Sequence, residues 1–307
     1  MRIGIDLGGT KIEAIALDDR GETLVRRRVP TPCGDYPAIL DAVGDLVAFV
    51  ERETSRRGSV GIASPGAISK QTGLIKNSNS TGLNGKPLDR DLARRLGREI
   101  RLENDANCFA LSEAVDGAAA DASVVFGIIL GTGVGGGLVV DKATITGRNR
   151  IAGEWGHNPL PWPRENERPG PPCYCGKTGC IETFLAGPGL ARDYCDRTGK
   201  KLTPEAITLA ATRGDGDAVA CFELYRDRLA RGLAGVINVL DPDKIVLGGG
   251  LSNVAQIYEE LPALVERYAF SDGIDTPIVR ARHGDSSGVR GAAWLWPLDA
   301  YSPLNQL

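Results

Sequence analysis

The sequence predicts an α/β fold made of two lobes that share one design. A length of 307 residues suits two domains of ordinary size. The chain opens with predicted strands over residues 2–7, 11–17 and 22–29, joined by short turns and followed by an amphipathic helix. The first strand and its glycine turn recur 123 residues later, from Gly4 to Gly127. So long an offset indicates duplicated domains rather than a solenoid.

Two turns organise the start of the first lobe. Gly8-Gly9 joins the first two predicted strands, and Asp19-Arg20-Gly21 joins the second to the third. This order differs from a Rossmann domain, in which a helix follows the first glycine turn. The helix that follows the third strand has a buried face with five apolar residues, Ile39, Val43, Leu46, Val47 and Val50.

The second lobe repeats the hairpin and adds a further glycine turn. Residues 127–133 match residues 4–10, and an apolar strand follows the glycines in both copies. A long helix is predicted over 217–240, and the strand 245–247 leads into Gly248-Gly249-Gly250. Backbone N–H groups in such turns favour anions, and glycine lets a flat ligand approach the backbone. Two facing hairpins therefore predict a polyphosphate site, with two unrelated tight hairpins as the alternative.

Thiols and an imidazole are concentrated in the middle of the chain. His157 is one of two histidines, and Cys173, Cys175 and Cys180 fall within eight residues. Three thiolates and one imidazole form the Cys₃His set of a structural zinc site. The Cys-x-Cys step is tighter than the usual zinc spacing, and a redox pair is the alternative. We predict the metal, and we expect the other cysteines, such as Cys33, to be ordinary buried thiols.

Composition excludes several classes of function. The 36 basic and 39 acidic residues nearly balance, and the basic cluster at 26–28 is expected on a solvated strand edge, so no nucleic-acid surface is predicted. No apolar stretch suits a signal peptide or a membrane span. We therefore expect a cytoplasmic protein that binds neither nucleic acid nor membranes.

Five motifs follow one another along the chain. They are Asp6-Leu-Gly-Gly-Thr-Lys11, Glu103-Asn-Asp-Ala-Asn107, Leu130-Gly-Thr-Gly-Val-Gly-Gly-Gly137, Gly153-Glu-Trp-Gly-His157 and Cys173-Tyr-Cys-Gly-Lys-Thr-Gly-Cys-Ile-Glu182. In this order they resemble the ROK family of bacterial sugar kinases, open reading frames and repressors. The resemblance runs from residue 3 to about residue 296. Segments 76–81, 156–162 and 283–296 are most similar to the bacterial fructokinase (mannofructokinase) branch.

The resemblance implies an actin-like, ribonuclease-H-like fold with ATP in the cleft between two α/β lobes. We expect an N-terminal lobe over residues 1–118 and a C-terminal lobe over 119–287, which contains the zinc site. A C-terminal helix over about 288–307 is expected to pack back on the first lobe. A homodimer is also consistent with the resemblance.

The implied reaction is ATP-dependent phosphorylation of a hexose hydroxyl with magnesium. Asp105 follows the predicted strand 100–103 and is the expected general base, which takes the proton of the sugar hydroxyl. Asn104 is expected to orient the sugar, and it also suits the N-cap of a helix over 106–113. Asp6 is assigned to Mg²⁺, through water. Phosphate and nucleotide contacts are assigned to Gly8, Gly9, Thr10, Lys11, Thr132, Gly133, Gly248 and Gly249.

The sugar hydroxyls are assigned mainly to Glu154, His157 and Glu182. Each carboxylate can accept bonds from neighbouring hydroxyls. By resemblance, one ring nitrogen of His157 binds zinc and the other is available to the sugar. Asn79 is a further sugar contact, and Gly66 is expected in a close backbone wall.

The expected function is a hexose kinase that phosphorylates the 6-hydroxyl of fructose, with mannose and glucose as further acceptors and N-acetylglucosamine as the poorest. A glucokinase or an N-acetylglucosamine kinase of the same family is the alternative. A sugar-sensing regulator of the family would need an N-terminal helix-turn-helix, for which the predicted strand at residue 2 leaves no room. A zinc-containing NAD oxidoreductase is disfavoured because Gly131-x-Gly133-x-x-Gly136 leads into a predicted strand, not a helix.

Overall fold

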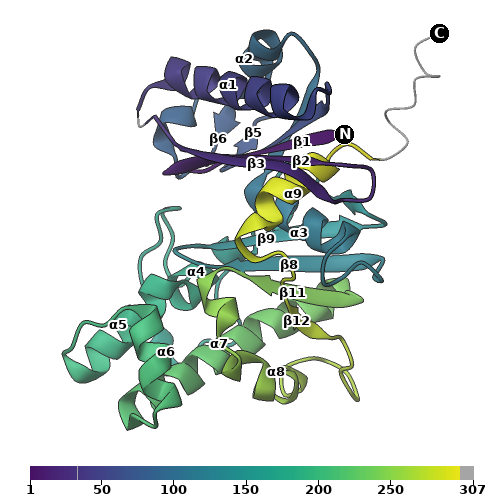
Figure 1. The fold of residues 1–307 in the computed structure, drawn as a ribbon. Helices are drawn as coiled ribbons and strands as arrows, with labels where there is room; N and C mark the ends of the chain where they lie inside the picture. Colours follow the sequence, from purple (N-terminus) through teal and green to yellow (C-terminus); the bar gives the residue numbers. More distant parts are fainter. Residues whose placement is uncertain (33, 298–307) are drawn as a thin grey trace.

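Two five-stranded sheets organise the computed structural model, which describes residues 1–32 and 34–297 (Figure 1). The first sheet has the order β3-β2-β1-β4-β7, and two helices cover its outer face. A short β5-β6 hairpin follows β4. The elements of this lobe are β1 (Arg2–Leu7), β2 (Lys11–Leu17), β3 (Thr23–Pro30), α1 (Tyr36–Thr54), β4 (Ser59–Ser64), β5 (Ala67–Ile68), β6 (Ile75–Lys76), α2 (Leu88–Leu96) and β7 (Ile100–Asn104).

The second sheet has the order β10-β9-β8-β11-β12 and packs against the helices of the C-terminal half. Among the described residues, no helix has both the length and the apolar character needed to cross a bilayer. The elements are β8 (Val124–Leu130), β9 (Val134–Val140), β10 (Ala143–Thr144), α4 (Ile181–Leu185), α5 (Gly187–Thr198), α6 (Pro204–Thr212), α7 (Gly216–Leu240), β11 (Lys244–Gly248), α8 (Gln256–Glu266) and β12 (Ile278–Arg280).

The two sheets are topological copies of each other. In both, the first strand pairs antiparallel with the second and parallel with a later strand: β1 with β2 and β4, and β8 with β9 and β11. The repeat of Gly4 at Gly127 thus places both glycine turns at equivalent ends of the central hairpins. Because β9 follows Gly133 directly, the rejection of a dinucleotide fingerprint is confirmed.

Two helices lie between the sheets, α3 (Asp105–Val115) and α9 (Ser287–Trp294) (Figure 1). They pack on each other, α3 against β8 and β9, and α9 against β1 and β4. Glycine permits this close approach, since a Cβ at Gly291 would lie 1.7 Å from the carbonyl oxygen of Cys108.

The predicted C-terminal helix over 288–307 is too long. The helix ends at Trp294, and residues 295–297 continue as a turn and an irregular segment. Pro297 explains the end, because the residue before a proline is disfavoured in the α conformation. Residues 298–307 lie outside the described part of the chain, as does Cys33.

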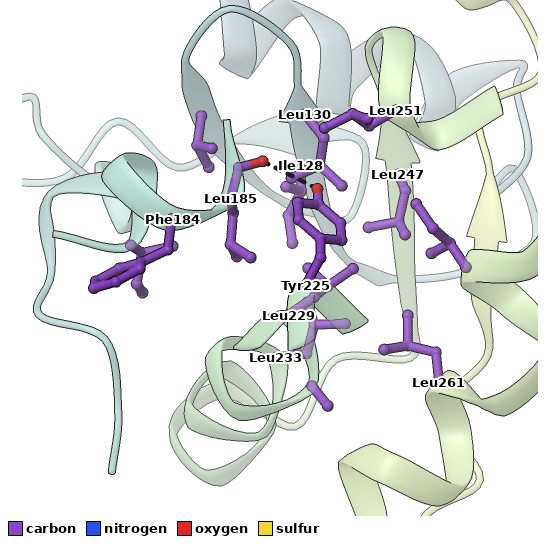
Figure 2. Packing of buried hydrophobic residues seen from close by; sticks show 14 of the residues in the cluster. Ile128, Leu130, Phe184, Leu185, Tyr225, Leu229, Leu233, Leu247, Leu251 and Leu261 are labelled. Carbon is purple, nitrogen blue, oxygen red and sulfur yellow. Dashed lines mark hydrogen bonds between the residues drawn. The ribbon is translucent and has the colours of Figure 1, made fainter. Parts of the chain in front are cut away.

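The core of the C-terminal lobe is centred on α7. Figure 2 shows Tyr225 and Leu229 pointing from this helix towards Ile128 and Leu247 of the sheet. The hydroxyl of Tyr225, which is fully buried, donates to the carbonyl oxygen of Leu185 at 3.0 Å. The apolar stripe of this helix is therefore core.

The basic cluster lies on β3, an edge strand of the first sheet, and its three arginines are exposed, as predicted. Arg26 and Arg28 both bind the carboxylate of Glu13, which is 1% exposed on β2; Nη2 of Arg28 lies 2.6 Å from Oε2. The two arginines remain partly exposed. A buried carboxylate that lies opposite them explains why the cluster stands on this strand.

Candidate active site

A polar cavity of about 220 Å³ lies where segments from both halves of the chain meet. It is smaller than the pockets of about 300–1,000 Å³ that hold drug-sized ligands, and therefore suits a small polar ligand. The cavity is lined by nine of the residues predicted for the site: Gly66, Asn79, Asn104, Asp105, Thr132, Gly133, Glu154, His157 and Glu182. Seven residues predicted to contact the nucleotide or its Mg²⁺ are not among the lining residues: Asp6, Gly8, Gly9, Thr10, Lys11, Gly248 and Gly249.

The junction of β7 and α3 presents Asn104 and Asp105 to the cavity. Oδ1 of Asn104 accepts the N–H of Ala106 at 2.9 Å, so this residue is the N-cap of α3. Its Nδ2 donates to the carbonyl oxygen of Gly66 at 3.2 Å. Both ends of the amide are therefore engaged within the protein. The capping role is confirmed, and the amide also ties α3 to the wall formed by Gly66.

Burial dominates the electrostatics of Asp105. It raises the pKa of this carboxyl from 3.8 to about 6, and the charge of Glu154 acts in the same direction, while the N–H of Ala106 opposes it. The pKa of Asp6 rises to about 7, first through burial and then through the charges of Asp105 and Glu13. Asp6 thus lies within electrostatic range of Asp105, although it does not line the cavity.

The first glycine turn is held by hydrogen bonds to the end of β3. The N–H of Gly8 donates to the carbonyl oxygen of Lys11 at 3.0 Å. Thr31 donates its hydroxyl to the carbonyl oxygen of Gly8 at 2.7 Å and its N–H to that of Thr10 at 3.0 Å. Gly9 and Thr10 remain exposed at the tip. The loop is preorganised and accessible beside Asp6.

The second glycine turn contacts a carboxylate that belongs to another segment. Thr132 and Gly133 line the cavity, and the N–H of Val134 donates to Oε2 of Glu182 at 2.9 Å. The N–H of Gly187 donates to the carbonyl oxygen of Gly131 at 2.8 Å. The turn is therefore fixed to the first turn of α4 and to the first residue of α5.

Packing explains the third glycine turn. Gly249 has φ +82, and a Cβ there would lie 2.4 Å from the carbonyl oxygen of Leu130. A Cβ at Gly248 would lie 2.4 Å from Cε2 of Phe109. Both glycines are required by the close approach of β11 to its neighbours, and their nucleotide contacts stay a prediction.

Four side chains converge at the start of α4 as a candidate metal centre. One ligand atom from each of His157, Cys173, Cys175 and Cys180 lies within 4.8 Å of all the others. Nδ1 of His157 lies 3.5 Å from Sγ of Cys173, and the sulfurs of Cys175 and Cys180 are 3.6 Å apart. A tetrahedron with zinc–sulfur bonds of about 2.3 Å has sulfur–sulfur edges of about 3.7 Å. The residues therefore fit a four-coordinate zinc ion.

Tyr174, which was not predicted for the site, occupies the free side of His157. Its hydroxyl lies 2.9 Å from Nε2 of that imidazole, so the nitrogen expected to face the sugar already has a partner. Its place between two metal-ligand cysteines was the available signal in the sequence. Other polar side chains of the lining that were not assigned from the sequence belong to Asn77, Glu103, Asn107, Thr146 and Arg150. Glu103 and Asn107 stand inside a recognised motif, whereas no motif contains Arg150.

Two topologically equivalent α/β lobes with a polar cavity between them define an actin-like protein. The chain belongs to the ROK family, which matches residues 2–298. The family resemblance read from the five motifs is therefore confirmed.

Similar proteins cover nearly the whole chain. An N-acetyl-D-glucosamine kinase of Vibrio vulnificus (strain YJ016) is 42% identical over 299 residues, which are 96% of this chain and 99% of that protein. The crystal structure of a ROK hexokinase from Thermus thermophilus has a TM-score of 0.85 and 33% identity, and the match covers 95% of this chain and 96% of that one. A ROK glucokinase from Streptomyces griseus, in complex with glucose and AMPPNP, has a TM-score of 0.77 and 29% identity, with 96% and 98% covered.

Proposed function

We propose that this protein is an ATP-dependent hexose kinase that transfers the γ-phosphoryl group of ATP to the 6-hydroxyl of a hexose. The observation that carries the proposal is the position of Asp105. This desolvated carboxyl stands at the first residue of α3, in a small polar cavity that also contains Glu154 and Glu182. The sugar-kinase names of the relatives that match the full length support the same activity.

Asp105 acts as the general base. It accepts the proton of the 6-hydroxyl as that oxygen attacks the γ-phosphorus and the bond to the leaving ADP oxygen breaks. With a pKa of about 6, its carboxylate is mostly charged at neutral pH and is still basic enough to take the proton. Glu154 and Glu182 accept hydrogen bonds from sugar hydroxyls and fix the orientation of the ring.

The exposed first glycine turn holds phosphates of the nucleotide. Backbone N–H groups of Gly9 and Thr10 act as donors, and Lys11 adds positive charge. Backbone N–H groups of Thr132 and Gly133 donate to the phosphates from the second lobe. Asp6 would hold Mg²⁺ through water, and the bound ion would supply positive charge that neutralises the phosphates. The nucleoside lies towards Gly248 and Gly249.

Zinc has a structural role in this proposal. His157 and the three cysteines hold the ion, which fixes the loop that leads into α4. Cys180 is the N-cap of α4, and Glu182 stands in the first turn of that helix. The metal centre therefore positions a sugar ligand without taking part in phosphoryl transfer.

We propose N-acetylglucosamine as the preferred sugar, in place of fructose. The support is the name of relatives that are at least 40% identical over nearly the whole chain. The comparisons do not support the earlier expectation of fructose. Fructose remains the second candidate because segments 76–81, 156–162 and 283–296 resemble the fructokinase branch.

A kinetic panel tests the proposal. N-acetylglucosamine, glucose, mannose and fructose are compared with saturating Mg²⁺-ATP, and the product is identified by ³¹P NMR. We expect the highest kcat/KM for N-acetylglucosamine, with phosphate on the 6-hydroxyl. A higher value for fructose would favour the second candidate. Failure to phosphorylate any of the four sugars would refute the kinase assignment.

A further inference from the structure

Tyr174 has an unusual position in the cavity. It stands between two candidate metal ligands, Cys173 and Cys175, yet the residue is 72% exposed. It also lines the same cavity as Glu154 and Glu182. The residue is thus part of the metal-binding loop by sequence and part of the sugar cavity by position.

Its contact with His157 is specific. The hydroxyl of Tyr174 lies 2.9 Å from Nε2, and the rings meet edge to face, with centroids 5.0 Å apart and an interplanar angle of 87°. The other ring nitrogen of His157, Nδ1, faces Sγ of Cys173 at 3.5 Å. Nδ1 thus faces the candidate metal centre, and Nε2 has the hydroxyl of a cavity-lining tyrosine as its partner.

The hydroxyl of Tyr174 has the hydrogen-bonding groups of a sugar hydroxyl, namely one donor and acceptor lone pairs. It therefore stands at the position where a hexose hydroxyl would meet His157. For a sugar to bind there, the phenol hydroxyl has to leave. Since most of the tyrosine is exposed, the ring can turn outwards with the loss of few contacts.

We propose that Tyr174 is a specificity-determining residue: its hydroxyl stands in for a sugar hydroxyl on His157, and its ring limits the size of the substituent there, which is a hydroxyl in glucose and an acylamino group in N-acetylglucosamine. A hydroxyl replaces the phenol hydroxyl at little steric cost. An acylamino group is larger and requires the ring to move further. The inference rests on the proposed hexose-kinase activity, but not on which hexose the wild-type protein prefers.

Two substitutions separate the hydrogen bond from the volume of the ring. Tyr174→Ala removes both, and it should raise the ratio of kcat/KM for N-acetylglucosamine to that for glucose by about tenfold. Tyr174→Phe removes only the competing hydroxyl, so KM should fall about threefold or more for both sugars while their ratio stays within about twofold. Lys177→Ala, an exposed change in the same loop but outside the cavity lining, is the matched control and should alter neither quantity.

Sugar affinity by calorimetry in the absence of ATP, together with zinc content, gives readouts other than activity. All variants should keep the zinc content of the wild type. An unchanged sugar ratio in Tyr174→Ala, or a higher KM for both sugars in Tyr174→Phe, would overturn the inference. If the wild-type protein phosphorylates neither sugar, the proposed function fails instead.

Discussion

In the proposed reaction, Asp105 has to meet two opposing requirements. Catalysis needs a charged carboxylate that can accept a proton, whereas burial favours the neutral acid and raises its pKa to about 6. The N–H of Ala106 donates to Oδ1 at 2.9 Å, which stabilises the charged form and offsets part of the rise in pKa. The cavity thus contains a carboxylate that is costly to ionise, and raised pKa values of this kind cluster at functional sites.

Replacing Asp105 by Asn should abolish most of the activity. The amide keeps the shape of the side chain but cannot accept the proton of the sugar hydroxyl. We expect kcat to fall by about 10²–10⁴-fold, with sugar affinity largely retained. Steady-state kinetics and calorimetry measure the two effects. Near-normal turnover in a folded Asp105→Asn protein would contradict the role of general base.

The same substitution should stabilise the fold at neutral pH. The folded-state pKa of about 6 exceeds the usual 3.8, so the contribution of this group is fully present below pH 3.8 and is lost as the pH rises through about 6. Ionisation in the folded state therefore costs about 3 kcal/mol, and Asp105→Asn should recover up to that amount at pH 7.5 and little at pH 4.

Urea unfolding at the two pH values, without nucleotide or Mg²⁺, tests this expectation. Asp18→Asn is the control, because the N–H of Glu22 lowers the pKa of Asp18 instead of raising it. That variant should show no stabilisation at pH 7.5. A stability gain for Asp105→Asn that does not depend on pH would refute the electrostatic explanation.

At the scale of the element, a short helix and a loop connect the candidate metal centre to the cavity. Cys180 is the N-cap of α4, and Glu182 accepts the N–H of Val134 from the second glycine turn. The helix packs in the core of the C-terminal lobe through Ile181, Phe184 and Leu185, whereas residues 174–177 of the loop are exposed. In the proposed protein, the ligands of zinc would therefore fix the loop and the N-terminal end of α4.

Removing one thiol should weaken sugar binding without weakening nucleotide binding. We expect about one zinc per chain in the wild type and its loss in Cys175→Ser. Because Glu182 and His157 would then lose their fixed positions, KM for the sugar should rise by about tenfold or more, while nucleotide affinity should stay close to normal. Elemental analysis and calorimetry with each ligand measure these effects.

Cys195→Ser is the matched control, since Cys195 is a free thiol in α5 outside the metal centre. It should keep both the zinc and the sugar affinity. A wild-type protein that lacks zinc and is fully active would contradict the coupling.

At the scale of the whole molecule, the two sheets meet through α3 and α9. Both helices approach the backbone of their neighbours closely, and glycines make room for the contact: a Cβ at Gly61 would lie 1.8 Å from the carbonyl oxygen of Ala292. The predicted division into residues 1–118 and 119–287 stays a prediction, as does the homodimer.

Adding one methyl group where α9 packs on α3 should destabilise the protein. Glycine to alanine in a helix interior normally stabilises by about 0.5–1 kcal/mol. At Gly291 the new Cβ would lie 1.7 Å from the carbonyl oxygen of Cys108, so we expect Gly291→Ala to cost about 1–3 kcal/mol instead. In α7, the nearest atom to a Cβ at Gly235 is 3.6 Å away, so Gly235→Ala should stabilise. Urea unfolding of both variants tests the contrast, and effects of equal sign would contradict it.

The sequence by itself determined the features that depend on neighbours along the chain. Alternating and helical apolar patterns predicted β1, β2, β3 and α7 within about a residue. The repeat from Gly4 to Gly127 predicted the duplicated hairpins, and the spacing of three cysteines predicted their convergence. These signals are readable because strand and helix periods, tight turns and ligand spacing are local properties.

The tertiary structure alone decided which groups share one environment. Three features of the cavity depend on segments far apart in sequence. They are the hydrogen-bond partner of Nε2 of His157, the hydrogen bond from Asn104 to Gly66 and the desolvation of Asp105. The close approach of the Gly249 backbone to Leu130, more than 100 residues earlier, was likewise not readable from the sequence. Contacts of this kind arise only when the lobes are folded, because burial and hydrogen-bond competition are properties of a position in space.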